Sequence, residues 1–226
     1  MDLSPRVYVH SKIARVIRLF EDLSNSHTIR FPIHQQLDRR AHRLKEAHTQ
    51  GNEAVVPIIT SWHPTLSGAT PDMVLGGPFS LCDSRETVAR EHGYSNWEAA
   101  LSQGTIPPNR DFELAVDVLL SGDIDHLRQL LRRDGSLAHR RSRFGHEATL
   151  LHYLGANGVE TERQVVPLNS AVLAKLLIDT GSNVNATAKV YGESTPLELL
   201  MTSQFPAEAG VRDDVRDILL AAGAIS

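Results

Sequence analysis

The feature that most constrains this fold is a short motif that recurs in the second half of the chain. Residues 177–186 read LIDTGSNVNA, residues 219–224 read LLAAGA, and residues 130–138 read LLRRDGSLA. Each copy ends a segment whose apolar residues recur at helical spacing. The helices predicted in this way cover residues 124–131, 171–178 and 214–220. Helix pairs that bury their apolar faces only against further copies form a solenoid, so the repeat predicts an all-α stack.

Two further motifs, TLLH at residues 149–152 and TPLE at residues 195–198, each precede a predicted helix. Together with the LLxxGA endings they resemble ankyrin repeats. An ankyrin unit opens Thr-Pro-Leu-His, packs two antiparallel helices and ends before a turn finger, and residues 112–138 fit as a first unit. The two motifs lie 46 residues apart, whereas the ankyrin period is about 33 residues. The resemblance therefore implies enlarged inter-helix loops, with insertions at residues 156–167 and 201–210.

The chain also resembles a narrower group of bacterial ankyrin-repeat proteins, in which a helical region precedes the repeats. The stretches that carry this resemblance are AREHGYSNW at residues 89–97, ATLLHYLGANGVE at residues 148–160 and FPAEAG at residues 205–210. It covers residues 35–226. Ser182 stands where the family commonly has Ala, and Phe205 where the group often has His. The resemblance implies a fold but no particular biochemical activity.

Residues 8–20 form a basic amphipathic pattern. Ile13, Val16, Ile17 and Phe20 share one face of the predicted helix, while Lys12, Arg15 and Arg18 take the other. Such a segment either docks on the rest of the protein, lies on a membrane or carries a targeting signal. The acidic pair Glu21 and Asp22 follows directly and favours the docked helix.

The rest of the first half predicts a set of short helices. Apolar spacing predicts helices from residue 34 to about residue 48 and over residues 53–62. Residues 65–78 hold three glycines and two prolines and predict a loop. Residues 83–101 predict two helices that are separated by a tight turn at Gly93.

The predicted hairpin carries side chains that are also used in catalysis. Asp83 and Glu86 form a capping-box-like pattern, which predicts that a helix begins there. Cys82 and His92 are ten residues apart, about 15 Å along a helix, so they cannot form a catalytic pair within it. We expect a packing role for Cys82.

A domain boundary is predicted near residues 105–110, where Gly104, Pro107 and Pro108 mark a linker. The chain then divides into an N-terminal amphipathic segment, a helical capping region and about three ankyrin repeats, two of them with insertions. These parts are predicted at residues 1–34, 35–105 and 106–226. With only about three repeats, the N-terminal helices are expected to cover the open apolar side of the first one.

Composition narrows the classes of function. The 226 residues carry a net charge of −4, and neither half is basic enough to predict nucleic-acid binding. The single cysteine excludes an intramolecular disulfide and favours a reducing, cytoplasmic location. No apolar run approaches the ~18 residues of a membrane-spanning helix. The 11 histidines form neither an HExxH nor a CxxC pattern, and the sequence has no phosphate-binding glycine loop, so we expect no metal and no cofactor.

The insertions are the most informative candidates for a site, because extra residues in a helix connection commonly serve a function. Arginines in the predicted first finger form a second candidate, for an acidic partner or a phosphate group. For His152 a structural role near the turn is the favoured interpretation. The candidate binding residues are His152, Tyr153, Asn157, Glu160, Asn169, Tyr191, Phe205, Glu208, Arg140 and Arg143.

Two functions remain open at this point. The leading one is a protein-interaction module without catalysis, which recognises a partner protein through the ankyrin concave face and the enlarged loops. The alternative is a small-molecule-binding protein or an enzyme with a pocket formed by the insertions, in which Glu160 or Glu208 acts with His152. Insertions that close over a pocket with a carboxylate inside favour the alternative. Insertions that splay beside a flat surface favour the module.

Overall fold

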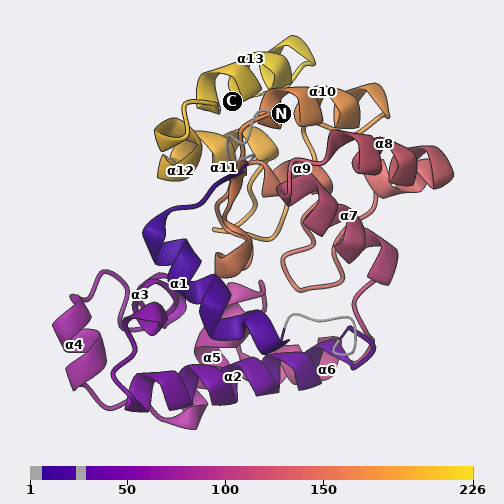
Figure 1. The fold of residues 1–226 in the computed structure, drawn as a ribbon. Helices are drawn as coiled ribbons and strands as arrows, with labels where there is room; N and C mark the ends of the chain where they lie inside the picture. The colour runs from indigo at the N-terminus through magenta and orange to yellow at the C-terminus, as the bar shows by residue number, and fades with distance from the viewer. Residues whose placement is uncertain (1–6, 24–28, 226) are drawn as a thin grey trace.

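The computed structural model describes residues 7–23 and 29–225, and within them the fold is mostly helical. Helices α1 to α6 form one group and helices α7 to α13 form another, above it in Figure 1. One two-stranded sheet joins the groups, because β1 (Val7–Tyr8) pairs antiparallel with β2 (Val166–Pro167). The all-α expectation is confirmed for the described residues.

The N-terminal group packs around two longer helices, α2 (Ile33–Thr49) and α5 (Leu81–Glu91), which lie against each other. Its shorter members are α1 (Ser11–Phe20), η1 (Glu21–Leu23), η2 (Glu53–Val55), α3 (Val56–Trp62), α4 (Pro71–Gly76) and α6 (Trp97–Gln103). The apolar face of α1 is buried at Ile13, Val16 and Phe20. The docked interpretation of the amphipathic segment is therefore confirmed.

Three local predictions for this group were wrong. The predicted loop contains helix α4, which Thr70 caps through its side chain and Pro71 opens at the first turn. Helix α5 begins two residues earlier than predicted, since the capping box joins Ser80 to Asp83. Cys82 is exposed on α5 and has no packing role. The turn at Gly93 is as predicted, with a φ of +81°.

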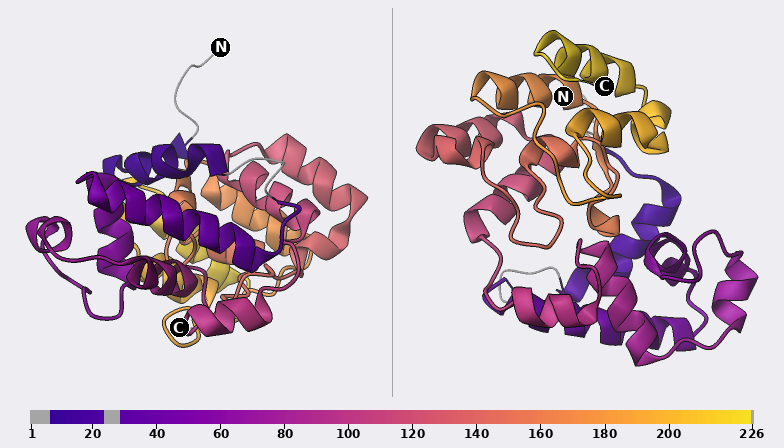
Figure 2. Two further views of the ribbon diagram at one scale, coloured as in Figure 1. Left: turned by 90° about the horizontal axis from the view of Figure 1, so that it is seen from below. Right: turned by 180° about the vertical axis from the view of Figure 1, so that it is seen from behind.

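The second group consists of two rows of helices. The first row is α7 (Arg110–Leu120), α9 (Leu150–Tyr153) and α11 (Pro196–Thr202), each in contact with the next. The second row is α8 (Ile124–Arg133), α10 (Ser170–Asp179) and α13 (Arg212–Ala221), again in contact in that order. The remaining elements are η3 (Gly135–Ala138), η4 (Thr161–Arg163) and α12 (Gln204–Glu208). Figure 2 shows these helices stacked from two further directions.

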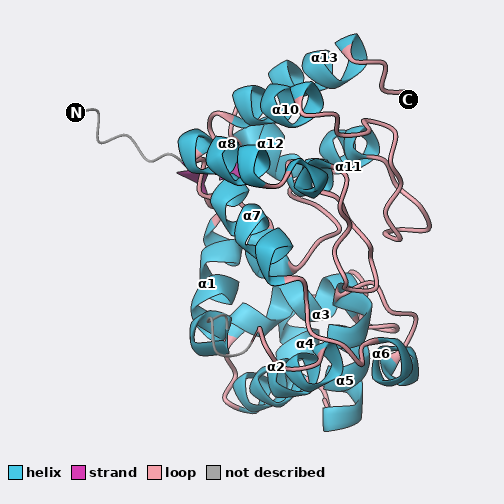
Figure 3. Cartoon of the chain, turned by 90° about the vertical axis from the view of Figure 1, so that its right-hand side faces the viewer, coloured by secondary structure: helices cyan, strands magenta, loops and turns pink. Residues whose placement is uncertain are grey.

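Hydrogen bonds repeat from one layer of this group to the next. Ser182 Oγ donates to the carbonyl of Ala138, and Asn185 Nδ2 donates to the carbonyl of Gly223, each joining equivalent turns of consecutive units. The long connections between α8 and α9 and between α10 and α11 also meet, because the Lys189 N–H donates to the carbonyl of His146. Figure 3 shows these connections as loops on one side of the stack.

Each group of helices has its own hydrophobic cluster, and each cluster receives one buried side chain from the other group. Ile13 of α1 joins the cluster of the second group, and Phe144 of the α8–α9 connection joins that of the first. That connection approaches α5 closely: the His146 N–H donates to the carbonyl of His92, 3.1 Å away. The described part of the chain holds no helix that is long and apolar enough to cross a membrane.

Candidate functional site

A cleft of about 640 Å³ lies where the two groups of helices meet. Its walls come from α1, η1, α2, the end of α5, the length of α7, the α8–α9 connection and the first insertion, residues 156–167. The charged and titratable side chains that line it are Glu21, Arg39, Arg40, His92, Arg110, Glu113, Asp117, Glu160, Glu162 and Arg163. Several of them are buried, which is unusual for charged groups and marks the cleft as the candidate site.

Helical positions explain why some of these charges are buried. Arg40 lies on the apolar stripe of α2, three residues after Leu37 and four before Leu44, so its side chain is 12% exposed. Glu113 lies three residues before the buried Val116 of α7 and is 4% exposed. Both side chains are therefore directed to the junction by the faces that bury their helices.

The first insertion places charged side chains opposite Arg40 and Glu113. Its short turn η4 places Arg163 against three carboxylates, with Nη1 2.6 Å from Glu113 Oε2 and 3.2 Å from Glu160 Oε1, and Nη2 3.2 Å from Asp117 Oδ1. The Arg163 guanidinium also lies 5.9 Å from the centre of the Tyr153 ring. A planar guanidinium with several donors suits such a three-carboxylate arrangement better than an ammonium does.

A second set of polar contacts ties the insertion to the N-terminal helices. Arg40 of α2 forms an ion pair with Glu162. The Thr161 N–H donates to Glu91 Oε1 of α5 at 3.1 Å. Glu91 is fully buried, and Glu160 is 2% exposed. The insertion thus lies between the two groups of helices and does not extend into solvent.

Two buried histidines flank these carboxylates. His92 donates Nδ1–H to the carbonyl of Val88 at 2.8 Å, and burial followed by the positive charge of Arg40 lowers its pKa to about 3. The ring is therefore neutral near pH 7, with Nε2 as an acceptor. His146 accepts the Ala148 N–H at Nδ1, and its Nε2 lies 3.7 Å from Glu160 Oε1.

The carboxylates of the cluster do not share one electrostatic environment. Burial raises the pKa of Glu91 and of Glu113. Burial also acts to raise the pKa of Glu160, but the Arg163 guanidinium and His146 outweigh it and hold that pKa well below its usual range. Glu160 is therefore the permanently ionised member, whereas Glu91 and Glu113 more readily take up a proton.

The comparisons with known proteins return no relative. No protein-family model, curated protein or solved structure matches this chain. The site is therefore interpreted from its own geometry. Within residues 7–23 and 29–225 no group of three or more His, Cys, Asp or Glu side chains is arranged to hold a metal ion.

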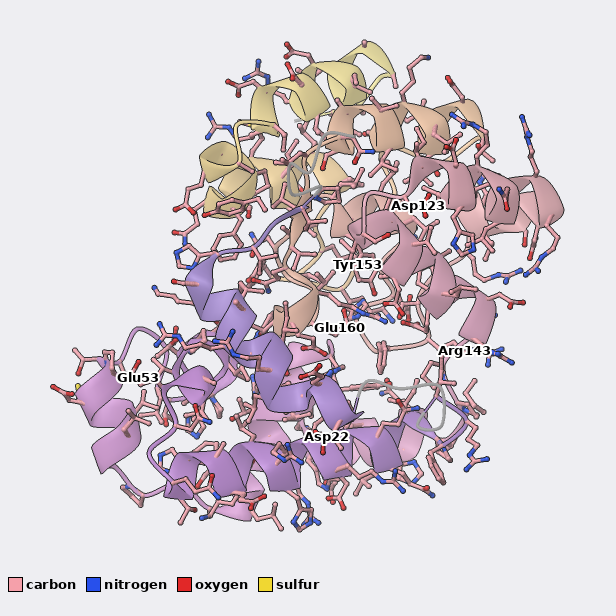
Figure 4. The ribbon with its side chains drawn as sticks, in the orientation of Figure 1. Asp22, Glu53, Asp123, Arg143, Tyr153 and Glu160 are labelled. Carbon is pink, nitrogen blue, oxygen red and sulfur yellow. The ribbon has the colours of Figure 1, made fainter. Side chains whose placement is uncertain are left out.

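Of the predicted binding residues, only Tyr153 and Glu160 belong to this cluster, and Figure 4 shows both at the centre of the molecule, between the two groups of helices. The ring of His152 forms hydrogen bonds with backbone groups. Its Nδ1 accepts from the Thr149 N–H in a capping box, and Nε2 lies 3.2 Å from the carbonyl of Ser194. Asn169 likewise donates to a backbone carbonyl, that of Gly122.

The remaining predicted residues lie at three other places. Tyr191 donates to Asn157 and stacks on Trp62, with the ring centres 5.8 Å apart. Phe205 and Glu208, in the second insertion, contact the first described residues through His10 and Tyr8. Arg140 pairs with Asp134, and Arg143, at the edge of the molecule in Figure 4, donates to the carbonyl of Pro107. The two insertions therefore do not converge on one pocket.

Sequence reasoning did not select Arg40, Glu91, Glu113 or His146 for the site. A signal for three of them exists, since each is an isolated charge on the apolar face of its helix: Arg40 between Leu37 and Leu44, Glu113 before Val116, and Glu91 three residues after Val88. The pattern shows that these charges need partners, but it does not reveal which segment supplies them.

Proposed function

We propose that this protein binds a small polar molecule in the cleft between its two groups of helices. The observation that carries the proposal is the cleft itself, about 640 Å³ in volume and walled by buried guanidiniums and carboxylates. This volume is in the range of small-molecule sites, and a few convergent polar groups are what such sites use to orient a ligand. Of the two functions left open by the sequence, this is related to the alternative, but the cleft is lined by the first insertion and the N-terminal helices and by no residue of the second insertion.

We further propose that the scaffold is an ankyrin-repeat stack of the bacterial type that the sequence resembles. Support comes from the two rows of helices, from the capping boxes at Thr149 and Thr195, and from His152, which bridges one unit to the carbonyl of Ser194 in the next. A single cysteine, Cys82, which is free and exposed, supports a reducing, cytoplasmic location.

Binding without chemistry accounts for the charged groups better than catalysis does. The Arg163 guanidinium pairs with Glu113, Glu160 and Asp117, and these ion pairs hold the three carboxylates in place. The low pKa of His92 removes it as a proton donor near pH 7. The groups are therefore arranged to recognise charge.

A thermal-shift screen against polar metabolites tests the proposal. Wild type is expected to gain several degrees in Tm with at least one compound. Glu160→Gln is expected to lose that gain. Glu208→Gln is a matched control, because Glu208 is exposed in the second insertion, outside the cleft. A gain that survives Glu160→Gln, or the absence of any stabilising compound, contradicts the proposal.

A protein partner is the second candidate function, and one surface favours it. Tyr191 is 62% exposed, and its ring stacks on Trp62. Its hydroxyl donates to Asn157, which in turn donates to Thr202, and Met201 next to Thr202 in the sequence is 42% exposed. Ordered exposed aromatics are frequent anchors of protein interfaces. Tyr191→Ser is expected to abolish capture of a partner from the native cytosol, whereas Glu160→Gln is expected to leave it unchanged.

A further inference from the structure

We infer that the arginine-rich surface formed by α8 and the start of the α8–α9 connection, residues 126–143, binds an acidic segment of a partner protein, rich in Asp and Glu. This inference goes beyond the proposed function, because none of these residues lines the cleft. Three observations carry it: the segregation of charge along the chain, the lack of carboxylates that would neutralise the arginines, and the anchoring of two guanidiniums on backbone carbonyls.

Positive charge is concentrated in this one segment. Residues 126–143 contain six arginines and one aspartate, and they contain no lysine and no glutamate. The whole chain, in contrast, carries a net charge of −4. The rest of the protein is therefore acidic, and an accumulation of one sign at a surface attracts partners of the opposite sign.

Most of these arginines are not neutralised by the protein itself. The carboxylates nearby in the sequence, Asp134 and Glu147, pair with Arg140 and Lys189. Within residues 7–23 and 29–225, four of the six arginines form no ion pair, and all four are exposed. They are Arg132, Arg133, Arg141 and Arg143, and together they are called the arginine surface. Their charge remains available to a partner.

Two guanidiniums of the arginine surface are held in place by uncharged groups. Arg141 Nη1 donates to the carbonyls of Glu147 and Thr187, at 2.9 and 2.6 Å. Arg143 Nη1 donates to the carbonyl of Pro107 at 3.0 Å. A carbonyl orders the guanidinium without cancelling its charge, and the fork of a guanidinium has further N–H groups for a second acceptor. An ordered side chain also loses less entropy when a partner binds.

The arginine surface lies on the outside of the second group of helices. Ser142 and Phe144 are buried, whereas Arg141 and Arg143 are exposed, so both arginines are directed away from the core. The Arg140–Asp134 pair brings this part of the connection back to the end of α8, where Arg132 and Arg133 lie. Figure 4 shows Arg143 at the edge of the molecule on the side where Figure 1 places α8.

The surroundings of the arginines favour a peptide over a membrane or a nucleic acid. All leucines of residues 126–143 are buried, so the surface offers no large apolar side chain to enter a bilayer. The segment contains no Phe, Tyr or Trp on which a base could stack. Guanidiniums bind carboxylates through two parallel N–H bonds, and arginine is enriched at protein interfaces. Asp and Glu side chains of a partner therefore fit this surface best.

Fluorescence anisotropy with the full chain and a labelled peptide of alternating Glu and Ser tests this inference. The peptide is expected to bind, and added salt is expected to weaken the binding. The double variant Arg132→Gln with Arg133→Gln is expected to weaken it about 10-fold, because two charge-assisted contacts are lost. Arg141→Gln with Arg143→Gln is a second variant with the same expectation.

The matched control removes the same amount of charge elsewhere. Arg212 and Arg216 of α13 are also accessible, but they pair with Asp213 and Asp217. Arg212→Gln with Arg216→Gln is therefore expected to bind the peptide like wild type. An equal loss of affinity in this control would show that only the net charge matters, and it would overturn the inference.

The remaining outcomes concern the kind of partner and the place where it binds. No binding of the peptide, or tighter binding of single-stranded RNA or of phosphatidylserine vesicles, overturns the acidic protein segment. Glu160→Gln and Tyr191→Ser are expected to leave the affinity for the peptide unchanged, because both residues lie outside the arginine surface. Loss of binding in either variant would place the peptide elsewhere and overturn the inference.

Discussion

The two insertions in the repeat stack have similar lengths but use their charged residues differently. The first, residues 156–167, buries Glu160 beneath the junction and pairs Arg163 with Glu113 of α7. The second, residues 201–210, keeps Glu208 exposed, where it accepts a hydrogen bond from the Tyr8 hydroxyl at 2.6 Å. One insertion joins the two groups of helices through buried charge, and the other contacts β1 only through the accessible Tyr8–Glu208 bond and nearby side chains.

The difference follows from what each insertion meets. The first lies opposite α1, α2 and α5, whose apolar faces carry Arg40 and Glu91, so its own charges find partners away from water. The second forms α12 beside α13 and contacts β1, His10 and, through Thr202 and Ser203, the start of the first insertion, and its Glu208 stays exposed. Buried charge that depends on its partner is costly to disrupt, whereas surface contacts are not. Four predictions test this comparison.

Replacing Arg163 is expected to have the largest effect. Arg163→Met leaves Glu113 and Glu160 buried without their cation, and breaking a buried pair in this way costs about 3–5 kcal/mol of unfolding free energy. Urea denaturation measures it. Arg140→Met is the matched control, since Arg140 pairs with an accessible Asp134, and it is expected to leave stability almost unchanged. Equal effects of the two variants would remove the distinction between the buried ion pairs of the first insertion and accessible ion pairs elsewhere.

Gly93 tests the close approach between α5 and the α8–α9 connection. It has a φ of +81°, and an added Cβ would lie 2.0 Å from the backbone nitrogen of His146. Gly93→Ala is expected to cost roughly 2–5 kcal/mol, from the left-handed backbone and the clash together. At Gly51, with a φ of +67° and open space around the Cβ position, the same change is expected to cost only about 1–2 kcal/mol.

The buried His152 is expected to make stability depend on pH. Burial lowers its pKa to about 4, while the unfolded chain keeps a value near 6.5, so the unfolded state binds more protons between these values. The contribution is complete above pH 6.5 and is lost as the pH falls towards 4, by about 1.4 kcal/mol per pH unit. Denaturation of wild type and His152→Asn at pH 7 and pH 5 checks this, and parallel pH dependences would contradict it.

Glu208→Gln is expected to have the smallest effect. It weakens the contact with Tyr8, and because both groups are accessible to water, global stability is expected to stay unchanged. Faster amide hydrogen exchange in residues 7–8, with unaltered exchange in α2, is the expected signature. A large fall in Tm would show that the second insertion is as integral to the core as the first.

Local features of this fold were predictable from the sequence because they depend on neighbours a few residues away. The repeat motifs located α8, α10 and α13 to within a few residues, and the TPLE motif marked the start of α11. The structural role favoured for His152 is confirmed by its bonds to Thr149 and Ser194. Helix α4 was missed because glycines and prolines around it outweighed the signal of Thr70 and Pro71.

The candidate site was only partly predictable. Tyr153 and Glu160 were selected because they lie in or beside an insertion, and both are buried at the junction. Arg40 and Glu113 were not, although each is a charge on an apolar helical face. Their burial depends on partners at a distance, since Glu113 meets Arg163 50 residues later and Arg40 meets Glu162 of the first insertion.

The sequence by itself determined most of the helices and the repeat of helix pairs in the second group, because these follow from spacing and hydrogen bonds within a few residues. The tertiary structure alone decided which charges are buried together. A buried ion pair needs its two groups at a short distance and shielded from water. Neither condition is met until the first insertion, α2 and α7 lie against one another. The cleft exists only in that arrangement.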